Sequence, residues 1–153
     1  MLYLREATEA DMALVLAWRN NPDVWRGTYS QRESITWREH QKWWGSREDH
    51  ISFMVVLVVN NISRDVGILN ISPLTYWSPE IGIIIGEVSL WGLGVGTKAF
   101  KLGCDWLKEK GYQWTSTTVL DSNVAMIKVL KKLGFKRTCE ARKDESRYAK
   151  ELK

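Results

Sequence analysis

Along this chain, stretches with a helical period of apolar positions alternate with short apolar runs, and each change of pattern marks an expected element. Apolar, β-branched runs bounded by turn residues predict strands over residues 1–7, 53–59, 66–71, 80–86, 116–120, 134–140 and 147–152. Apolar positions three and four apart predict helices over residues 9–20, 37–46, 98–110 and 124–133. No linker or repeat interrupts this order. We therefore expect one α+β domain over residues 1–153, with helices on both faces of a mixed, mostly antiparallel sheet.

Capping and turn residues define the ends of the early elements. Thr8 precedes the helix over residues 9–20, and Thr36 precedes the helix over residues 37–46. Residues 60–65 predict the hairpin turn between the second and third strands. In the first helix we expect four apolar side chains to face inward, namely Met12, Leu14, Val15 and Trp18.

A glycine-rich turn joins the strand over residues 80–86 to the helix that follows, and it carries the strongest chemical signal in the chain. Its residues are Trp91, Gly92, Leu93, Gly94, Val95, Gly96 and Thr97. Glycines at alternate positions let backbone N–H groups turn toward one point without obstruction by a Cβ atom. The unpaired N–H groups and the positive dipole end of the next helix add to them. The turn therefore predicts a site for the phosphates of a cofactor.

The turn does not fit two other phosphate-binding motifs. The Walker A pattern ends in Gly-Lys-Ser/Thr, whereas Gly96, Thr97 and Lys98 follow a different order. The dinucleotide fingerprint requires its third glycine three positions after the second, whereas Gly92, Gly94 and Gly96 alternate.

A second helix start lies downstream, after the β-prone run over residues 116–120. Either Asp121 or Ser122 is expected to cap the helix over residues 124–133, and Gly134 is expected to end it. The inward stripe of that helix comprises Ile127, Leu130 and Leu133.

These two segments together resemble the motifs of the GNAT superfamily of N-acetyltransferases. The acyl-CoA loop of that family, Gln/Arg-x-x-Gly-x-Gly/Ala, is similar to residues 91–96, with Trp91 in the Gln/Arg place. The family's Asn-x-x-Ala/Ser … Gly-Phe helix is similar to the segment with Asn123, Gly134 and Phe135. The early segments look like the branch that acts on sugar-nucleotide amines or on ribosomal-protein N-termini.

The resemblance implies a GNAT-like sheet with a splayed strand pair, formed by residues 80–86 and 116–120. It implies transfer of the acetyl group of acetyl-CoA to a primary amine by direct attack, without an acyl-enzyme. The pyrophosphate of coenzyme A would lie on residues 93–97. The pantetheine arm would lie between Asn123 and the backbone groups of two strand residues, Ile84 and Ile85.

The sequence offers two candidates for the general base but no general acid at the positions where relatives carry one. Glu80 opens the strand beside the splay, where many relatives carry a carboxylate, and His40 is the rival because histidine titrates near neutral pH. The positions where relatives carry a tyrosine or serine acid hold Leu130 and Met126. Either Ser122 or no protein group would then protonate the thiolate. The missing acid keeps a second reading open, an acyl-CoA-binding sensor or interaction module without catalysis.

The acceptor site is expected in the segment of the first two helices and in the hairpin loops. The chain has nine tryptophans, and amphipathic aromatic side chains are typical of binding sites in loops. Both basic and acidic residues fall in this region, so charge does not separate an aminosugar nucleotide from a peptide N-terminus. The candidate acceptor residues are Arg19, Asn20, Trp25, His40 and Trp77.

Composition excludes several other classes. Basic and acidic residues are interspersed around a net charge of +4, which does not favour direct nucleic-acid binding. The two cysteines are too few for a disulfide scaffold, and no Cys/His cluster has metal-ligand spacing, so no metal is implied. No apolar run approaches the ~20 residues needed to cross a bilayer, and the start lacks a signal-peptide pattern. We expect a cytoplasmic enzyme that does not bind membranes and that can form a homodimer.

Overall fold

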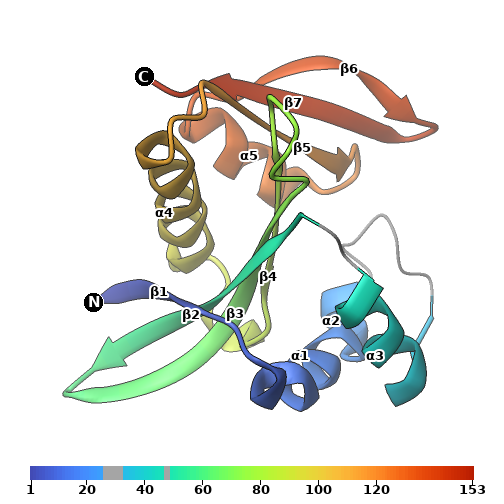
Figure 1. Cartoon of the computed structure of the whole chain (residues 1–153), viewed down its shortest axis with the longest axis vertical. Coiled ribbons are helices and arrows are strands. Elements are labelled where there is room, and N and C mark those ends of the chain that lie inside the picture. Colours follow the sequence, from blue (N-terminus) through green and yellow to red (C-terminus); the bar gives the residue numbers. More distant parts are fainter. Residues whose placement is uncertain (26–32, 47–48) are drawn as a thin grey trace.

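One sheet with the strand order β1-β2-β3-β4-β5-β7-β6 organises the protein (Figure 1). The structure is a computed structural model, and it describes residues 1–25, 33–46 and 49–153. The strands are β1 (Leu2–Glu6), β2 (Ile51–Val59), β3 (Ile62–Ser72), β4 (Glu80–Ile85), β5 (Trp114–Leu120), β6 (Lys136–Arg142) and β7 (Glu145–Glu151). The helices are α1 (Met12–Arg19), α2 (Pro22–Trp25), α3 (Trp37–Ser46), α4 (Val95–Glu109) and α5 (Val124–Lys132), with short 3₁₀ turns at Glu9–Asp11 and Val88–Leu90. The expected α+β class is confirmed.

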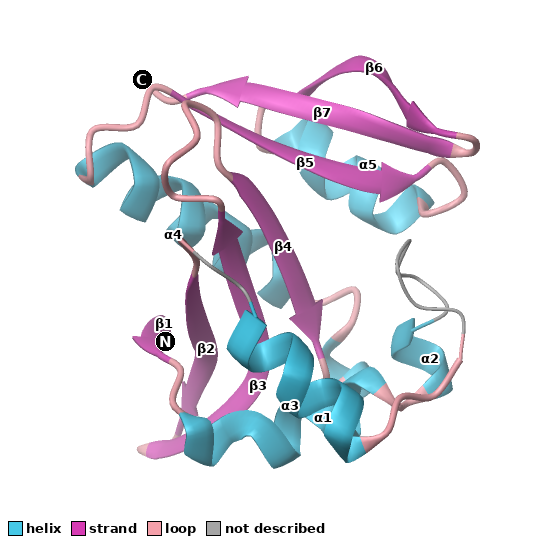
Figure 2. Ribbon diagram, turned by 45° about the vertical axis from the view of Figure 1, so that its right-hand side comes forward, coloured by secondary structure: helices cyan, strands magenta, loops and turns pink. Residues whose placement is uncertain are grey.

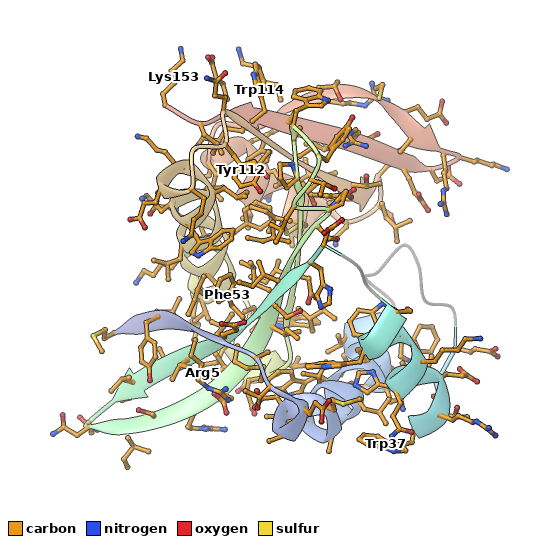
Figure 3. All side chains as sticks on the ribbon, in the orientation of Figure 1. Arg5, Trp37, Phe53, Tyr112, Trp114 and Lys153 are labelled. Atoms are coloured by element: carbon orange, nitrogen blue, oxygen red, sulfur yellow. The ribbon has the colours of Figure 1, made fainter. Side chains whose placement is uncertain are left out.

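Helices cover both faces of the sheet, as the sequence predicted (Figure 1). The larger core joins the face of the sheet that α4 covers, with Phe100 and Leu107 fully buried there. Phe53 lies between the sheet and α4, with its ring centroid 5.4 Å from that of Trp106 (Figure 3). The smaller core on the opposite face consists of Val15, Trp18, Met54 and Ile68. Apolar side chains from alternate strand positions thus stabilise both faces.

Arg5 fixes the start of α1 against the sheet (Figure 3). Its Nη2 lies 2.7 Å from Oδ1 of Asp11 and 2.9 Å from Oδ2 of Asp65 on β3. Hydrogen bonding to this guanidinium holds the pKa of Asp11 below its usual range. The Asp11 carboxylate also accepts the backbone N–H of Thr8 at 2.8 Å, so the predicted helix entry at Thr8 is stabilised by a side chain from the next turn.

Three expectations about local structure were wrong. The hairpin turn is not residues 60–65 but the pair Asn60 and Asn61, whose φ angles of 51° and 64° suit a tight two-residue turn. Leu14 is 38% exposed, because the helix orients Met12, Val15 and Trp18 inward at spacings of three. The helix expected from residue 98 begins at Val95, immediately after the glycine turn.

The strands β4 and β5 run parallel and separate almost at once, which confirms the splayed pair (Figure 2). Their register contains one pair of residues, Glu80 opposite Ser116. Buried threonine hydroxyls replace part of the missing ladder, since Thr115 Oγ1 donates to the Pro79 carbonyl at 2.8 Å and Thr117 Oγ1 donates to the Ile81 carbonyl at 2.7 Å. Beyond Ile81 the two strands leave a gap between them.

The end of β4 is held on its other side by a close contact between a glycine and a tryptophan. An ideal Cβ on Gly86 would lie 2.0 Å from Cγ of Trp18, so only glycine allows the indole of α1 to approach this closely. Trp18 is buried, as the sequence predicted. This contact fixes α1 relative to the strand that borders the gap.

We predict that Gly86→Ala lowers the free energy of unfolding by about 1–3 kcal/mol, because the added methyl group forces the Trp18 ring to move. Gly82→Ala on the same strand is the matched control, since its Cβ would meet nothing within 4 Å. Urea denaturation of the two variants measures the difference. Equal stability of the two variants would contradict the role of the Trp18 contact.

Candidate active site

A cavity of about 700 Å³ opens between the end of β4, the glycine-rich turn and α5. Nine of the residues expected to contact the cofactor line it: Ile84, Ile85, Trp91, Gly92, Leu93, Gly94, Gly96, Thr97 and Asn123. Nine further residues line the cavity, and the sequence did not predict a cofactor contact for any of them: Asp23, Val24, Ile83, Leu90, Ala125, Met126, Lys128, Val129 and Lys132. The short helix α2 therefore borders the same space as α5.

The backbone of the turn explains two of its glycines. Gly92 and Gly94 have φ angles of +82° and +85°, a conformation that side chains with a Cβ rarely adopt. Gly94 is the N-cap of α4, so the first N–H groups of the helix have no partner within it. Gly96 has ordinary helical geometry and lines the cavity, and a Cβ there would lie 3.7 Å from Cγ1 of Ile85. Val95 is the exception in the turn, because its side chain is buried in the core.

Trp91 ties the turn to β4. Its indole Nε1 donates to the Ile85 carbonyl at 2.8 Å, while 47% of the residue stays exposed at the cavity. The Ile85 carbonyl thus already has a partner within the protein. Ile84 pairs with Ile68 of β3, and the Gly86 N–H donates to the Val66 carbonyl, so alternation turns the backbone groups of Ile84 toward β3 and those of Ile83 toward the gap.

Asn123 caps α5, whereas the sequence favoured Asp121 or Ser122 for that position. The Asn123 side chain accepts the backbone N–H of Met126 at 3.2 Å. Asp121 has a different role, because its carboxylate accepts the hydroxyl of Ser146 on β7. The helix begins at Val124, as the sequence predicted, and Asp121 and Ser122 form the turn before it, so the cap is the residue directly before the helix, Asn123. The expected C′ glycine is confirmed, since Gly134 has a φ angle of +91°.

The positions at which relatives carry an acid cannot supply a proton here. Leu130 is fully buried in the core below α5. Met126 lines the cavity but has no acidic hydrogen. Ser122 is exposed and does not line the cavity. The cavity itself therefore offers no side-chain acid from these three residues.

Two lysines of α5 give the cavity a basic rim. Lys128 and Lys132 are four residues apart and lie on one side of the helix. They belong to a basic region, since residues 121–153 carry ten Lys or Arg against five Asp or Glu, a net charge of +5. The i, i+4 spacing was the sequence signal that could have identified this pair. Together with the unpaired N–H groups at the start of α4, the lysines suit an anionic ligand.

Glu80 lies outside the cavity but on a path that leads to it. It opens β4, is partly buried, and faces Ser72 of β3 and Ser116 of β5 in the sheet register. Strand alternation places Glu80, Gly82 and Ile84 on one face, about 13 Å from first to last. Gly82 is exposed, and a Cβ there would meet nothing within 4 Å. The surface of β4 is thus open between Glu80 and the cavity wall at Ile84.

His40 is fully buried, and the structure does not bring it to this site. Its Nδ1 lies 3.1 Å from Nη1 of Arg19, and its Nε2 lies 2.9 Å from the Met12 carbonyl. Because arginine can only donate, Nδ1 accepts and Nε2 carries the proton, which makes the ring neutral with both nitrogens bonded. Burial of this ring argues against His40 both as a base and as a substrate contact.

Arg19 and Asn20 belong to the same structural network between α1 and α3. The Arg19 guanidinium lies 4.1 Å from the ring centroid of Trp43, and burial lowers the pKa of Arg19. Asn20 uses both ends of its amide on the backbone of Ile35, each at 2.8 Å. These two polar side chains stabilise the α1–α3 layer and are not directed at an acceptor.

The remaining acceptor candidates lie apart from each other. Trp25 is partly buried at the end of α2, whereas Trp77 is 65% exposed in the loop before β4 and packs against Tyr76 with a centroid distance of 5.6 Å. The structure therefore does not gather the five predicted acceptor residues into one pocket. Three of the charged residues in the expected acceptor region, Arg26, Arg32 and Glu48, lie outside the described residues.

The comparisons with known proteins agree with this geometry. The acetyltransferase (GNAT) domain family matches residues 1–136, so the chain belongs to that family. Uncharacterized protein MJ1062 of Methanocaldococcus jannaschii is 40% identical over 147 residues, which cover 96% of this chain. The match covers 30% of that relative, so this chain spans less than a third of its length.

Solved structures share the fold over almost the whole chain. A domain from Methanocaldococcus jannaschii DSM 2661 is 39% identical, with a TM-score of 0.96 and 99% of both chains covered. A spermidine N-acetyltransferase from Vibrio cholerae, in complex with CoA and spermine, is 14% identical, with a TM-score of 0.83. That likeness covers 99% of this chain and 95% of the other, and it shows a common fold.

The part of the chain that the structure describes was expected to hold neither a metal site nor a membrane-spanning helix, and its features bear on both. Across residues 1–25, 33–46 and 49–153, no three His, Cys, Asp or Glu side chains come together as a metal site. Over the same residues, no helix combines the length and the apolar character that spanning a membrane requires. Cys104 is buried, and desolvation raises the pKa of its thiol to about 11, so it is not a nucleophile.

We predict that Asn123→Ala lowers the free energy of unfolding by about 1 kcal/mol, because the alanine cannot accept the Met126 N–H. Asn123→Asp keeps an acceptor oxygen and should retain most of the stability. Chemical denaturation without any ligand measures both variants. An alanine variant as stable as the parent would show that Asn123 contributes no cap, and would leave ligand binding as its role.

Proposed function

We propose that this protein is an N-acetyltransferase that moves the acetyl group of acetyl-CoA to a primary amine. The observation that carries the proposal is the cavity between β4 and α5, with the glycine turn and the start of α4 in its wall. It lies beside the gap that opens between the parallel strands β4 and β5 after their one register pair, so a ligand there can reach the strand edge of β4. Acetyl-CoA is a cytoplasmic metabolite, so the proposal includes that location, and the expected homodimer stays a prediction.

The residues present fit coenzyme A. The unpaired N–H groups of the first turn of α4 suit its pyrophosphate, and Gly96 leaves the room that the phosphates need. Lys128 and Lys132 add positive charge on the opposite rim. The apolar wall formed by Ile83 and Ile84, with the backbone groups of Ile83 toward the gap, suits the pantetheine arm and its amides. When bound, acetyl-CoA would supply an activated thioester for attack by the amine.

Glu80 is the general base of the proposed reaction. An amine attacks only as the neutral species, so a proton must leave its ammonium form before attack. The open surface over Gly82 leaves space for water between the Glu80 carboxylate and the cavity wall. Glu80 therefore accepts the proton through water, while the neutral amine lies over β4 between Glu80 and Ile84.

The departing thiolate needs no dedicated acid in this proposal. A thiol has an ordinary pKa of about 8.5, so a thiolate leaves far more readily than an amide anion would. The absence of acidic hydrogens at Leu130 and Met126 is compatible with a thiolate that solvent protonates. The acceptor is a small-molecule amine or a protein N-terminus, and the fold neighbour named as a spermidine N-acetyltransferase of Vibrio cholerae supports an amine acceptor.

We predict that acetyl-CoA raises the melting temperature of the protein and that Gly96→Asp abolishes the rise. A ligand that binds only the folded state stabilises it, and a carboxylate at position 96 repels the phosphates. Gly96→Asn is the matched control, because it adds the same volume without charge. Differential scanning fluorimetry over a series of acetyl-CoA concentrations measures the shift. Equal shifts in the aspartate variant and the parent would remove the phosphate assignment.

We predict that Glu80→Gln lowers kcat/KM by about 10²- to 10⁴-fold near neutral pH, because glutamine cannot accept the proton. The loss should shrink as the pH rises, since more of the acceptor is then neutral before it binds. Glu140→Gln on the exposed strand β6 is the control for the loss of one carboxylate. Thiol release from acetyl-CoA with an amine panel measures the rates.

The same assay separates the enzyme from a non-catalytic acyl-CoA sensor. Amine-dependent thiol release by the parent protein supports the enzyme. Saturable binding of acetyl-CoA without such release would identify the binding module. A pH–rate profile of Glu80→Gln that matches the parent would transfer the role of base to another group.

A further inference from the structure

Arg147 on β7 lies on the same side of the sheet as Glu80. The neighbouring β7 residue Tyr148 is buried in the core that α4 covers, so alternation directs Arg147 to the opposite face. Its Nη2 donates to Oγ of Ser116 at 2.9 Å. Ser116 is the residue that pairs with Glu80 across the β4–β5 junction. The guanidinium thus reaches the strand neighbour of the proposed base, and adjacent strands are only about 5 Å apart.

The partners of Arg147 are unusual for a partly buried arginine. The Ser116 hydroxyl that it contacts is uncharged, almost fully buried, and itself donates to the Ser78 carbonyl at 3.2 Å. Among the residues that the structure describes, Arg147 forms no ion pair with Glu80 or Glu145, which lie on the same face. Within the described residues, the guanidinium therefore has one neutral acceptor for its five N–H donors.

We propose that Arg147 binds an anionic group of the acceptor, so that the acceptor is an amine that also carries a carboxylate or a phosphate. This assignment rests on the proposed function, because it takes the reacting amine to lie beside Glu80. The planar guanidinium matches both anions through paired hydrogen bonds, and Ser116 holds it in place for that contact. The amine would then lie over β4 and the anion over β5, where the Arg147 guanidinium reaches Ser116, on one face of the sheet.

Charge complementarity separates this acceptor from a polyamine. A flexible polycation calls for carboxylates along its path, whereas the face beside Glu80 presents a guanidinium without an ion pair. The sequence left an aminosugar nucleotide and a peptide amine undecided, since charges of both signs were present. The charge that would distinguish these acceptors is that of Arg147 on β7, and not the charges in the region of the first two helices. An acceptor with a negative group of its own could bind to this guanidinium.

Matched acceptors that differ only in the anion test the assignment. The first pair is glucosamine 6-phosphate against glucosamine, and the second is phenylalanine against phenylalaninamide. Steady-state thiol release from acetyl-CoA gives kcat and KM for each compound. We expect the anionic member of at least one pair to have the higher kcat/KM, and the pair that shows the effect distinguishes phosphate from carboxylate.

The decisive variant is Arg147→Met, with Lys150→Met as its control. Lys150 lies three residues along the same strand, beside Thr115 on the opposite face, so its loss removes the same charge elsewhere. Arg147→Met should raise KM for the anionic acceptor by about 10- to 100-fold with little change in kcat, and should leave the neutral acceptor unaffected. Arg147→Lys should recover part of the loss, since it keeps the charge without the paired donors.

Two results would overturn the assignment. One is equal kcat/KM for the charged and neutral members of both pairs in the parent protein. The other is a loss in Arg147→Met that falls equally on both members. If the parent shows no amine-dependent thiol release at all, the proposed function fails, and calorimetric titration of glucosamine 6-phosphate decides the anion site independently. Binding to the parent that Arg147→Met removes supports the site, whereas no binding, or equal binding, refutes it.

Discussion

The divergence of β4 from β5 is the constraint on which the rest of the molecule depends. One register pair, Glu80 with Ser116, joins the strands before they separate, and two threonine hydroxyls secure the junction. Beyond it, strand edges that would have paired with each other are left for a ligand. The cavity at Ile84 and the open surface at Gly82 both lie along β4 beside this gap. Trp18 against Gly86 and Trp91 on Ile85 keep the far end of β4 from closing it.

Much of the fold could be predicted because the apolar pattern reports burial directly. The order of elements, the sheet class and the core positions of Trp18 and Leu130 agree with the structure. The errors concern the ends of helices and strands, where several neighbouring residues are equally suited to a turn or to an N-cap. Asn60 and Asn61 each adopt a positive φ angle, so these two residues complete the turn that the sequence predicted over residues 60–65. At α5, three consecutive residues are good N-caps, and only the geometry of the turn selects Asn123.

The two halves of the candidate site differed in how far the sequence could define them. The cofactor turn consists of consecutive residues, so its local backbone brings them together, apart from the side chain of Val95. The acceptor half depends on contacts between distant segments. Arg19 and His40 are as suitable for a buried network as for a ligand, and the fold uses them for the former. Arg147 could not be identified, because its position beside Ser116 follows from the pairing of β5 with β7.

The basic region of residues 121–153 has a consequence for how ligands reach the protein. The rest of the chain, residues 1–120, carries twelve Lys or Arg against thirteen Asp or Glu, a net charge of −1, so the positive charge is concentrated at one end of the molecule. Such a separation gives the protein a permanent dipole, with α5, β6 and β7 at its positive pole. In that field an anion diffuses toward the positive pole before it makes any contact, and dissolved salt screens the attraction at distances beyond about 10 Å. The rate at which an anionic ligand encounters the protein thus depends on the charge distribution of the whole chain, whereas its affinity depends on the contacts in the cavity.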